Sequence, residues 1–411
     1  MLEEYYSDGP AIARHREGPL GRYVDGFVAW LSGQGYARAT VRDFVAVFSA
    51  LGRWLQRREL EVRDLSTELV THFLRRSGSG GIRDHERAAL NRILAHLRRT
   101  GIAPGEDTVS EPTSAECMVE EFGRYLRNDR ALAEATLQGY CARVRLFLSA
   151  CFRTGSVEVA RLSVKDVEDF ALHYAHGRTP KSIQTMLTAL RSWLRFLYLR
   201  ELISEELAYR APRVAFWRQT SPPKWLADKD VERVLNCCDR HSAIGQRDYA
   251  VLLLLARLGL RAGEVLLLEL DDIRWEAAEI TVHGKGPHRK RFPLPDDIGA
   301  AIAAYLKTAR PRCDSRRVFL RVRAPYLGLG HASTVDTIVS NALKRAGLNP
   351  PMKGAHLFRH SLATRMLRNG ATLTEIGQIL HHANPDTTSI YAKVDIDGLR
   401  GLAMPWPGDH S

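Results

Sequence analysis

The chain has 411 residues, of which 45% are hydrophobic, so it is long enough for two or three domains that each bury a core. Its formal net charge of +12 indicates a polyanionic partner, usually nucleic acid, although a merely basic soluble surface has the same composition. The most apolar stretch, 251–270, carries Arg257, Arg261 and Glu264, which excludes a membrane span there, and the N-terminal residues are not those of a signal peptide.

The first half of the chain is predicted to contain an internal repeat of helices. The pattern Phe-x-x-Trp-Leu at 27–31 parallels Phe-x-x-Tyr-Leu at 122–126, and Leu-Ser followed by Val and Phe recurs at 65–73 and 162–170. An almost constant offset is the mark of a duplicated domain. Two unrelated bundles of amphipathic helices would also share part of this pattern.

Linkers divide the chain into three predicted domains. Polar residues over 101–112, and prolines without helical periodicity near residue 220, are typical of connections between domains. The predicted division is an irregular lead-in over 1–20, helical bundles over 21–103 and 115–208, a linker over 209–224, a third domain over 225–400 and a tail over 401–411.

An arginine follows a glycine turn early in the third domain. Arg261 comes after Leu258-Gly259-Leu260 at a predicted helix start, where backbone N–H groups also favour an anion. Glu264 is three residues further on, which is close enough to orient the arginine. A surface Arg–Glu pair of little energetic value would give the same spacing.

Alternating apolar residues at 280–294 surround a Gly-Lys-Gly turn and predict a β-hairpin. Lys285 in this turn could reach a phosphate as a point charge or a proton donor. His288, Arg289 and Lys290 could compete for that role.

The stretch 356–369 has the apolar spacing of an amphipathic helix, and Gly370 is a typical stop signal after it. His356 and Arg359 are three residues apart, so they share one face of this helix.

Two further helices are predicted before the tail. Residues 372–375 form a capping box for a helix that ends just before the adjacent pair His381-His382. Asn384 and Pro385 then suit the start of a third, short helix that contains Tyr391.

Arginine, histidine and tyrosine together suit chemistry on a phosphodiester. Arginine binds phosphate bidentately, histidine moves protons near neutral pH, and nearby cations favour the phenolate of a tyrosine. Their combined action would give a covalent phosphotyrosine. Each feature alone has a plainer explanation, because His-x-x-Arg is common on helix surfaces and a lone tyrosine usually packs in a core. A histidine cluster could bind zinc, but no cysteine or carboxylate stands at ligand spacing here.

In this order, these motifs resemble those of the tyrosine recombinases, the phage integrase family. The resemblance covers roughly residues 115–400 and departs from the family at His381, where glycine is usual, and at Pro385, where less rigid residues are usual. It implies a catalytic set with Glu264 in support of the first arginine: Arg261, Lys285, His356, Arg359, His382 and Tyr391.

The resemblance also implies a fold that is mainly α with a small β-sheet, in which helical DNA-binding bundles precede an α+β catalytic domain. Residues 115–208 resemble the core-binding domain of the family, and residues 21–103 resemble an extra bundle of the same type. Basic residues with a predicted role in DNA binding are Lys181, Arg191, Arg195 and Arg289.

The implied activity is site-specific recombination of double-stranded DNA through a 3′-phosphotyrosine, without cofactor or metal and in the service of a mobile element. The implied assembly is a tetramer on two DNA sites, built from monomers or dimers, in which the tail with Pro405 and Trp406 could dock on a neighbour. Cysteines without Cys-x-x-Cys spacing favour reduced thiols in a cytosolic protein. The expected location is the cytoplasm of a bacterium, in association with the nucleoid. The alternatives are a catalytically silent DNA-binding relative, a type IB topoisomerase and a zinc protein.

Overall fold

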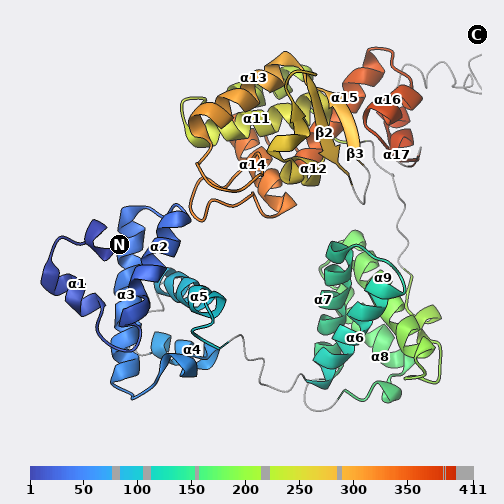
Figure 1. Ribbon diagram of the computed structural model, residues 1–411. Coiled ribbons are helices and arrows are strands. Elements are labelled where there is room, and N and C mark those ends of the chain that lie inside the picture. The colour runs from blue at the N-terminus through green and yellow to red at the C-terminus, as the bar shows by residue number, and fades with distance from the viewer. Residues whose placement is uncertain are drawn as a thin grey trace, which may run out of the picture. The chain divides into compact units, whose positions relative to one another are not determined.

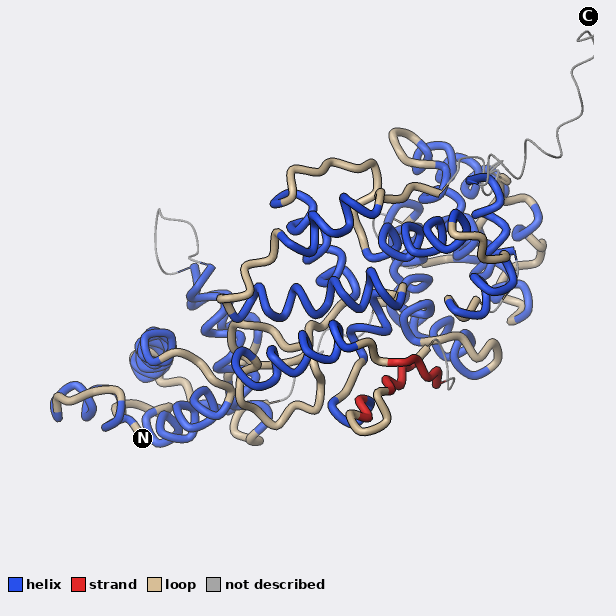
Figure 2. Tube along the Cα trace, turned by 90° about the horizontal axis from the view of Figure 1, so that it is seen from above, coloured by secondary structure: helices blue, strands red, loops and turns tan. Residues whose placement is uncertain are grey.

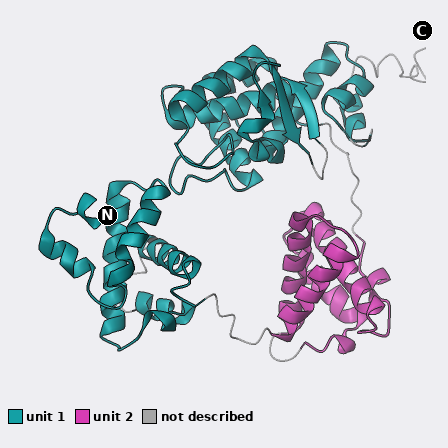
Figure 3. Ribbon diagram, in the orientation of Figure 1, with its two compact units in different colours: residues 1–105, 221–411 teal, residues 106–220 magenta. Residues whose placement is uncertain are grey.

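The computed structural model describes residues 1–75, 84–104, 113–152, 157–213, 223–284, 289–382, 384 and 386–394. Contacts group the chain into two compact units, one of residues 1–105 with 221–411 and one of residues 106–220 (Figure 3). Helices account for most of the described chain, and the strands are gathered in one place (Figure 2). The predicted fold class, mainly α with a small β-sheet, is confirmed.

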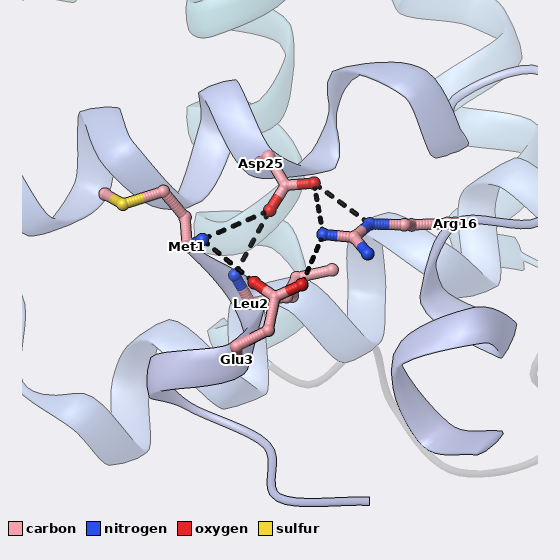
Figure 4. A network of polar contacts seen from close by, with 5 residues as sticks. All are labelled: Met1, Leu2, Glu3, Arg16 and Asp25. Atoms are coloured by element: carbon pink, nitrogen blue, oxygen red, sulfur yellow. Dashed lines mark hydrogen bonds and ion pairs between the residues drawn. The ribbon is translucent and has the colours of Figure 1, made fainter. Parts of the chain in front are cut away.

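The prediction of an irregular lead-in over 1–20 is wrong, because helix α1 covers Gly9–His15. Leu2 and Leu20 are buried in the core of the N-terminal bundle, so apolar burial orders this segment. Arg16 adds ion pairs to Glu3 at 2.8 Å and to Asp25 at 2.9 Å (Figure 4). Sequence periodicity misses such a segment because α1 has seven residues and no buried side chain of its own.

The two bundles share one order of elements. The first consists of α2 (Val24–Gly33), α3 (Arg38–Gln56), the 3₁₀ turn η3 (Val62–Asp64), α4 (Thr67–Arg75) and α5 (Asp84–Arg99). The second consists of α6 (Ser114–Asn128), α7 (Glu134–Cys151), the 3₁₀ turn η4 (Val159–Arg161), α8 (Val164–Ala175) and α9 (Pro180–Leu199). Each bundle stacks a phenylalanine on an aromatic ring three residues later, Phe27 on Trp30 at 6.0 Å and Phe122 on Tyr125 at 6.3 Å between ring centroids. These matches support the predicted repeat, and the domain boundaries stay a prediction.

Residues 223–394 form an α+β assembly around the buried helix α11 (Figure 1). Its helices are α10 (Asp228–Asn236), α11 (Ala243–Leu258), α12 (Ala262–Leu267), α13 (Asp296–Ala304), α14 (Ala332–Arg345), α15 (Ala355–Arg368), α16 (Leu373–Ile379) and α17 (Asp386–Ser389). Val251 to Leu255 are almost completely buried, which explains why the most apolar stretch of the sequence belongs to a core helix. Helices α13 and α15 both pack against it.

The predicted hairpin is confirmed on its described strands. Strand β1 (Ile273–Arg274) pairs with β2 (Glu279–His283), which pairs antiparallel with β3 (Arg289–Pro293). Ile280 lies opposite Phe292 and both are buried, so one face of the hairpin joins the core. Strand β3 lies next to α16 (Figure 1). The ring of Phe292 contacts the ring of His381, which follows α16, with centroids 4.7 Å apart.

Gly259 is the residue on which the connection from α11 to α12 depends. It ends α11 in the left-handed conformation with φ of +61°, and an added Cβ would lie 2.8 Å from Leu380 and 3.0 Å from Leu362. We expect Gly259→Ala to destabilise this region by about 1–3 kcal/mol, because alanine is strained there and crowds two leucines. Amide hydrogen exchange of α11 and α15 should become faster.

Gly263 provides the matched control for this substitution. It lies inside α12, and an added Cβ would meet nothing within 4 Å. Alanine is the better helix former by about 1 kcal/mol, so exchange in Gly263→Ala should be unchanged or slower. Equal exchange in the two variants would contradict this account of the turn.

Candidate active site

Arg359 is held at the centre of the site by two backbone carbonyls. It projects from α15 with 6% of its surface exposed, and its guanidinium donates to the carbonyl of Gly259 at 2.7 Å and to that of Leu380 at 2.5 Å. Burial, and next the charge of Arg261, lower the pKa of Arg359 to about 10. The group therefore stays cationic at neutral pH and is fixed between the ends of α11 and α16.

Arg261 stands at the N-terminus of α12, as predicted, and is oriented by Glu264. One oxygen of Glu264 accepts from the Arg261 guanidinium at 2.9 Å and the other accepts from the Arg261 amide at 2.8 Å. The carboxylate of Glu264 is buried, so the pair is not the weak surface ion pair that the sequence spacing would also have allowed. Arg261 itself remains partly exposed. Its charge is the second cause, after burial, of the lowered pKa of Arg359, so the two cations act on one another electrostatically.

Tyr391 lies in the same region but is 99% buried, with 1% of its surface exposed. The predicted third helix ends at Ser389, and Tyr391 belongs to the 3₁₀ turn Ile390–Val394 that follows it. Its ring packs in a small core with Leu362, Ile376 and Leu380. Burial raises the pKa of the phenol to about 12, and the charges of Arg359 and Arg261 act against that rise.

The hydroxyl of Tyr391 is hydrogen-bonded to Nδ1 of His360 at 2.9 Å. His360 follows Arg359 on α15 and was not among the predicted site residues. His356 lies one turn earlier, at a ring distance of 6.4 Å from His360, and its side chain reaches solvent. The sequence shows that His356 and His360 share a helix face, because they are four residues apart. It does not show that Tyr391 folds back onto that face, because this contact depends on the tertiary structure.

His382 stacks on Tyr391 with ring centroids 6.4 Å apart and an interplanar angle of 8°. Its Nδ1 is hydrogen-bonded to the hydroxyl of Thr388 at 2.7 Å. His381 adopts a left-handed backbone with φ of +49°, a conformation that glycine adopts without strain. This conformation explains why glycine suits position 381, and the histidine adopts it with some backbone strain. The carbonyl of His381 accepts a hydrogen bond from Lys290 at 3.0 Å.

The structure thus brings Arg261, Arg359, His382 and Tyr391 together around one region. Sequence comparison assigns that arrangement to a family. The profile described as "Phage integrase family" matches residues 224–397, and "Phage integrase, N-terminal SAM-like domain" matches residues 119–201. A relative from Sinorhizobium fredii, named "Putative integrase/recombinase y4rA", is 43% identical over 97% of both chains.

The chain belongs to the tyrosine recombinase family. Tyrosine recombinase XerD of Listeria innocua is 29% identical over 67% of this chain and 94% of its own length. Among solved structures, the XerH site-specific recombinase bound to its difH substrate matches 72% of this chain and 98% of its own, with 17% identity and a TM-score of 0.54. The Tn1549 transposon integrase in complex with circular intermediate DNA matches 68% of this chain and 99% of its own, with 18% identity and a TM-score of 0.52. These two structures support the fold.

The hairpin of this recombinase contributes Lys290 to the border of the site. Burial, and next the charge of Arg261, lower the pKa of Lys290, and its amino group is fixed on the His381 carbonyl. Lys285 and His288 lie outside the described residues, so the predicted role of Lys285 is untested. Arg289 begins β3 and is exposed.

The remaining predicted DNA contacts lie on α9 of the second bundle. Lys181 is exposed in its first turn, and Arg195 is exposed and 3.9 Å from the carboxylate of Glu206. Arg191 is half-buried and donates to the carbonyl of Pro212 at 2.5 Å, so part of its guanidinium holds the chain that leaves the bundle. A role in DNA binding stays a prediction for all three residues.

No helix in the described ranges is long and apolar enough to span a membrane. The same ranges contain no group of three or more His, Cys, Asp or Glu side chains placed to hold a metal ion.

The two histidines beside Tyr391 are expected to make the fold acid-sensitive. Burial, followed by neighbouring charges, lowers the pKa of both His360 and His382 to about 4, against about 6.5 in an unfolded chain. As pH falls from 6.5 towards 4, the unfolded chain binds protons that the folded chain does not, so stability falls. The loss should be up to about 3 kcal/mol per histidine, and less where solvent reaches the ring.

Amide hydrogen exchange in α15 at pH 7 and pH 5 measures this effect, once the intrinsic pH dependence of exchange is subtracted. The double variant His360→Gln and His382→Gln should show a smaller loss of protection between the two pH values. His176→Gln, at an exposed position of the second bundle, should behave like the unchanged protein in α15. An unchanged loss in the double variant would contradict the assignment.

Proposed function

We propose that this protein is a site-specific DNA recombinase that cleaves and rejoins DNA through a covalent 3′-phosphotyrosine at Tyr391. The observation that carries the proposal is the position of the Tyr391 hydroxyl within the site of its own chain. It is hydrogen-bonded to His360, and the charges of Arg359 and Arg261 both act on its pKa. A nucleophile delivered in this way requires no segment from a second subunit.

The proposed roles follow from where negative charge develops. A phosphodiester carries one negative charge, and its pentavalent transition state gains another, so the guanidinium groups of Arg261 and Arg359 hold the two non-bridging oxygens. His382 supplies a further donor: when Thr388 donates to its Nδ1, its Nε2 carries the proton that a phosphate oxygen accepts. Fixed donors at developing charge are each worth about 3–4 kcal/mol in comparable sites.

Attack by the Tyr391 oxygen forms a bond to phosphorus and releases the 5′ oxygen of the next nucleotide. Lys285 is the proposed proton donor to the leaving 5′ oxygen. His356 is proposed to assist proton transfer at the site. The phosphotyrosine keeps the energy of the phosphodiester, so a strand of a partner duplex reverses the attack without ATP or metal. Lys181, Arg191, Arg195 and Arg289 are the proposed phosphate contacts outside this centre.

The proposed partners are two double-stranded DNA sites joined by a tetramer of this chain, with monomers or dimers off DNA. The XerH recombinase bound to a palindromic difH substrate and the Tn1549 integrase in complex with circular intermediate DNA support DNA as the partner. A mobile element is the proposed context, supported by relatives named integrase/recombinase in Sinorhizobium fredii. A cytoplasmic, nucleoid-associated location follows from that substrate. The tail, including Pro405 and Trp406, lies outside the described residues, and its docking on a neighbour stays a prediction.

A two-site plasmid assay tests the proposal. A supercoiled plasmid carries two copies of the DNA that flanks the gene, and the protein is added without nucleotide or metal. We expect recombinant circles that appear only when both copies are present. Relaxation that occurs equally with one copy or none would identify a topoisomerase, and binding without any strand exchange would identify a silent DNA-binding relative.

A further inference from the structure

His360 makes a direct contact with the reacting atom of the proposed nucleophile. Its Nδ1 is 2.9 Å from the hydroxyl oxygen of Tyr391, and the two rings meet edge-on with centroids 5.6 Å apart. Tyr391 is almost fully buried, so solvent has little access to the phenol. A proton that leaves this hydroxyl therefore needs an acceptor within the protein, and His360 holds the position of that acceptor.

The other histidines of the site are engaged differently. His356 reaches solvent one turn before His360 on α15. The ring of His382 is parallel to the Tyr391 ring with centroids 6.4 Å apart, and its Nδ1 is bonded to Thr388 rather than to the phenol. Of the nitrogens of these rings, Nδ1 of His360 is the one hydrogen-bonded to the Tyr391 hydroxyl among the described contacts.

We propose that His360 is the proton acceptor for Tyr391 during strand cleavage and the proton donor to it during rejoining. This inference rests on the proposed recombinase function. In cleavage, the O–H bond of Tyr391 breaks, its proton moves to Nδ1 of His360, the tyrosine oxygen bonds to phosphorus, and the bond from phosphorus to the 5′ oxygen breaks. The leaving oxygen takes a proton from the general acid on the opposite side of the phosphate. In rejoining, the proton on His360 returns to the departing phenolate.

Charges around His360 suit this cycle. Burial, then His356 and Arg359, lower the pKa of His360, so its ring is neutral and able to accept a proton before DNA arrives. A bound phosphodiester adds negative charge beside Arg359 and offsets part of that cation's effect on the ring. The basicity of His360 therefore rises when the substrate is in place. His382, whose pKa is also lowered, is a second neutral ring next to Tyr391 and adds no opposing charge.

The test separates proton transfer from simple positioning. In His360→Asn, an amide atom takes the approximate place of Nδ1 and keeps a hydrogen-bond partner for Tyr391 without providing a base. Cleavage is measured in single turnover on a nicked suicide substrate that carries the flanking DNA site. We expect His360→Asn to slow cleavage by about 10²–10³-fold, with DNA binding unchanged.

Replacing Tyr391 by a fluorinated tyrosine, whose phenol is more acidic, gives the second measurement. If His360 removes the proton, fluorinated tyrosine should raise the cleavage rate of His360→Asn by at least about tenfold. It should raise the cleavage rate of the protein with His360 intact much less. His241→Asn serves as the matched control, because it removes an exposed histidine of the catalytic region that lies outside the site. It should cleave at the rate of the unchanged protein and gain nothing from fluorination.

Three results decide the matter. Cleavage by His360→Asn at the rate of the unchanged protein would overturn the inference and leave the recombinase function standing. A slow variant that fluorination does not rescue would assign His360 a positioning role and also overturn it. Failure of the unchanged protein to form any adduct on the flanking DNA would overturn the proposed function itself, and the role of His360 with it.

Discussion

Tyr391→Phe should abolish covalent attachment to DNA while leaving the catalytic region folded. The substitution removes only a hydroxyl, and the ring keeps its packing against Leu362, Ile376 and Leu380. The cost in stability should be about 1 kcal/mol, since His360 loses one hydrogen-bond partner. Loss of the nucleophile should lower the cleavage rate by 10⁴-fold or more, on the order seen when other enzymes lose theirs.

Tyr305→Phe is the matched control for this loss. Tyr305 is also buried in the catalytic region, and its hydroxyl accepts a hydrogen bond from the amide of Leu320 at 3.2 Å. The two variants therefore make the same chemical change with similar structural cost. Adduct formation, followed on denaturing gels with labelled suicide substrate, should persist in Tyr305→Phe. Adduct in Tyr391→Phe, or its loss in both variants, would refute the assigned nucleophile.

Arg359→Lys should have the second-largest effect, because lysine keeps the charge and loses the fork. The guanidinium donates to the carbonyls of Gly259 and Leu380 and also places its charge at the site. A single ammonium group cannot make both hydrogen bonds and bind phosphate. We expect cleavage to fall by about 10²–10³-fold, the usual cost of one fixed donor at developing charge. A buried carbonyl left without its donor should also cost about 1–3 kcal/mol of stability.

Arg368→Lys tests whether this loss is specific to the site. Arg368 is an exposed residue of the same helix, with its guanidinium 4.1 Å from the ring centre of Trp225. Cleavage in this variant should stay within about twofold of the unchanged protein, because the charge is kept and no buried carbonyl is involved. Single-turnover rates and hydrogen exchange of α15 measure both consequences. Similar rates for Arg359→Lys and Arg368→Lys would show that Arg359 does not act as a fixed donor.

The sequence predicted those parts of the fold that depend on interactions between residues close together in the chain. The capping box at Thr372 and Glu375, the hairpin strands and the helix that carries Arg359 follow from spacing over a few residues, and all are present. The orientation of Arg261 by Glu264 was also accessible, because the two residues are three apart on one chain segment.

Features that depend on distant segments could not be predicted in the same way. His360 meets Tyr391 across 31 positions of sequence, and only the return of the chain after α17 makes that contact. Arg191 looked like a free cation for phosphate, but Pro212, 21 positions later, accepts from it. The segment before Gly21 is ordered through the burial of Leu2. The spacing of apolar residues in this segment does not predict that burial.

The identity of the residue that becomes attached to DNA is the sharpest test of Tyr391 as the nucleophile. The protein is incubated with a nicked suicide substrate carrying the DNA that flanks its gene, the adduct is digested, and the modified peptide is sequenced by mass spectrometry. We predict a nucleotide joined through its 3′ phosphate to the oxygen of Tyr391 and to no other residue. Attachment at a different side chain, or through a 5′ phosphate, would contradict the account.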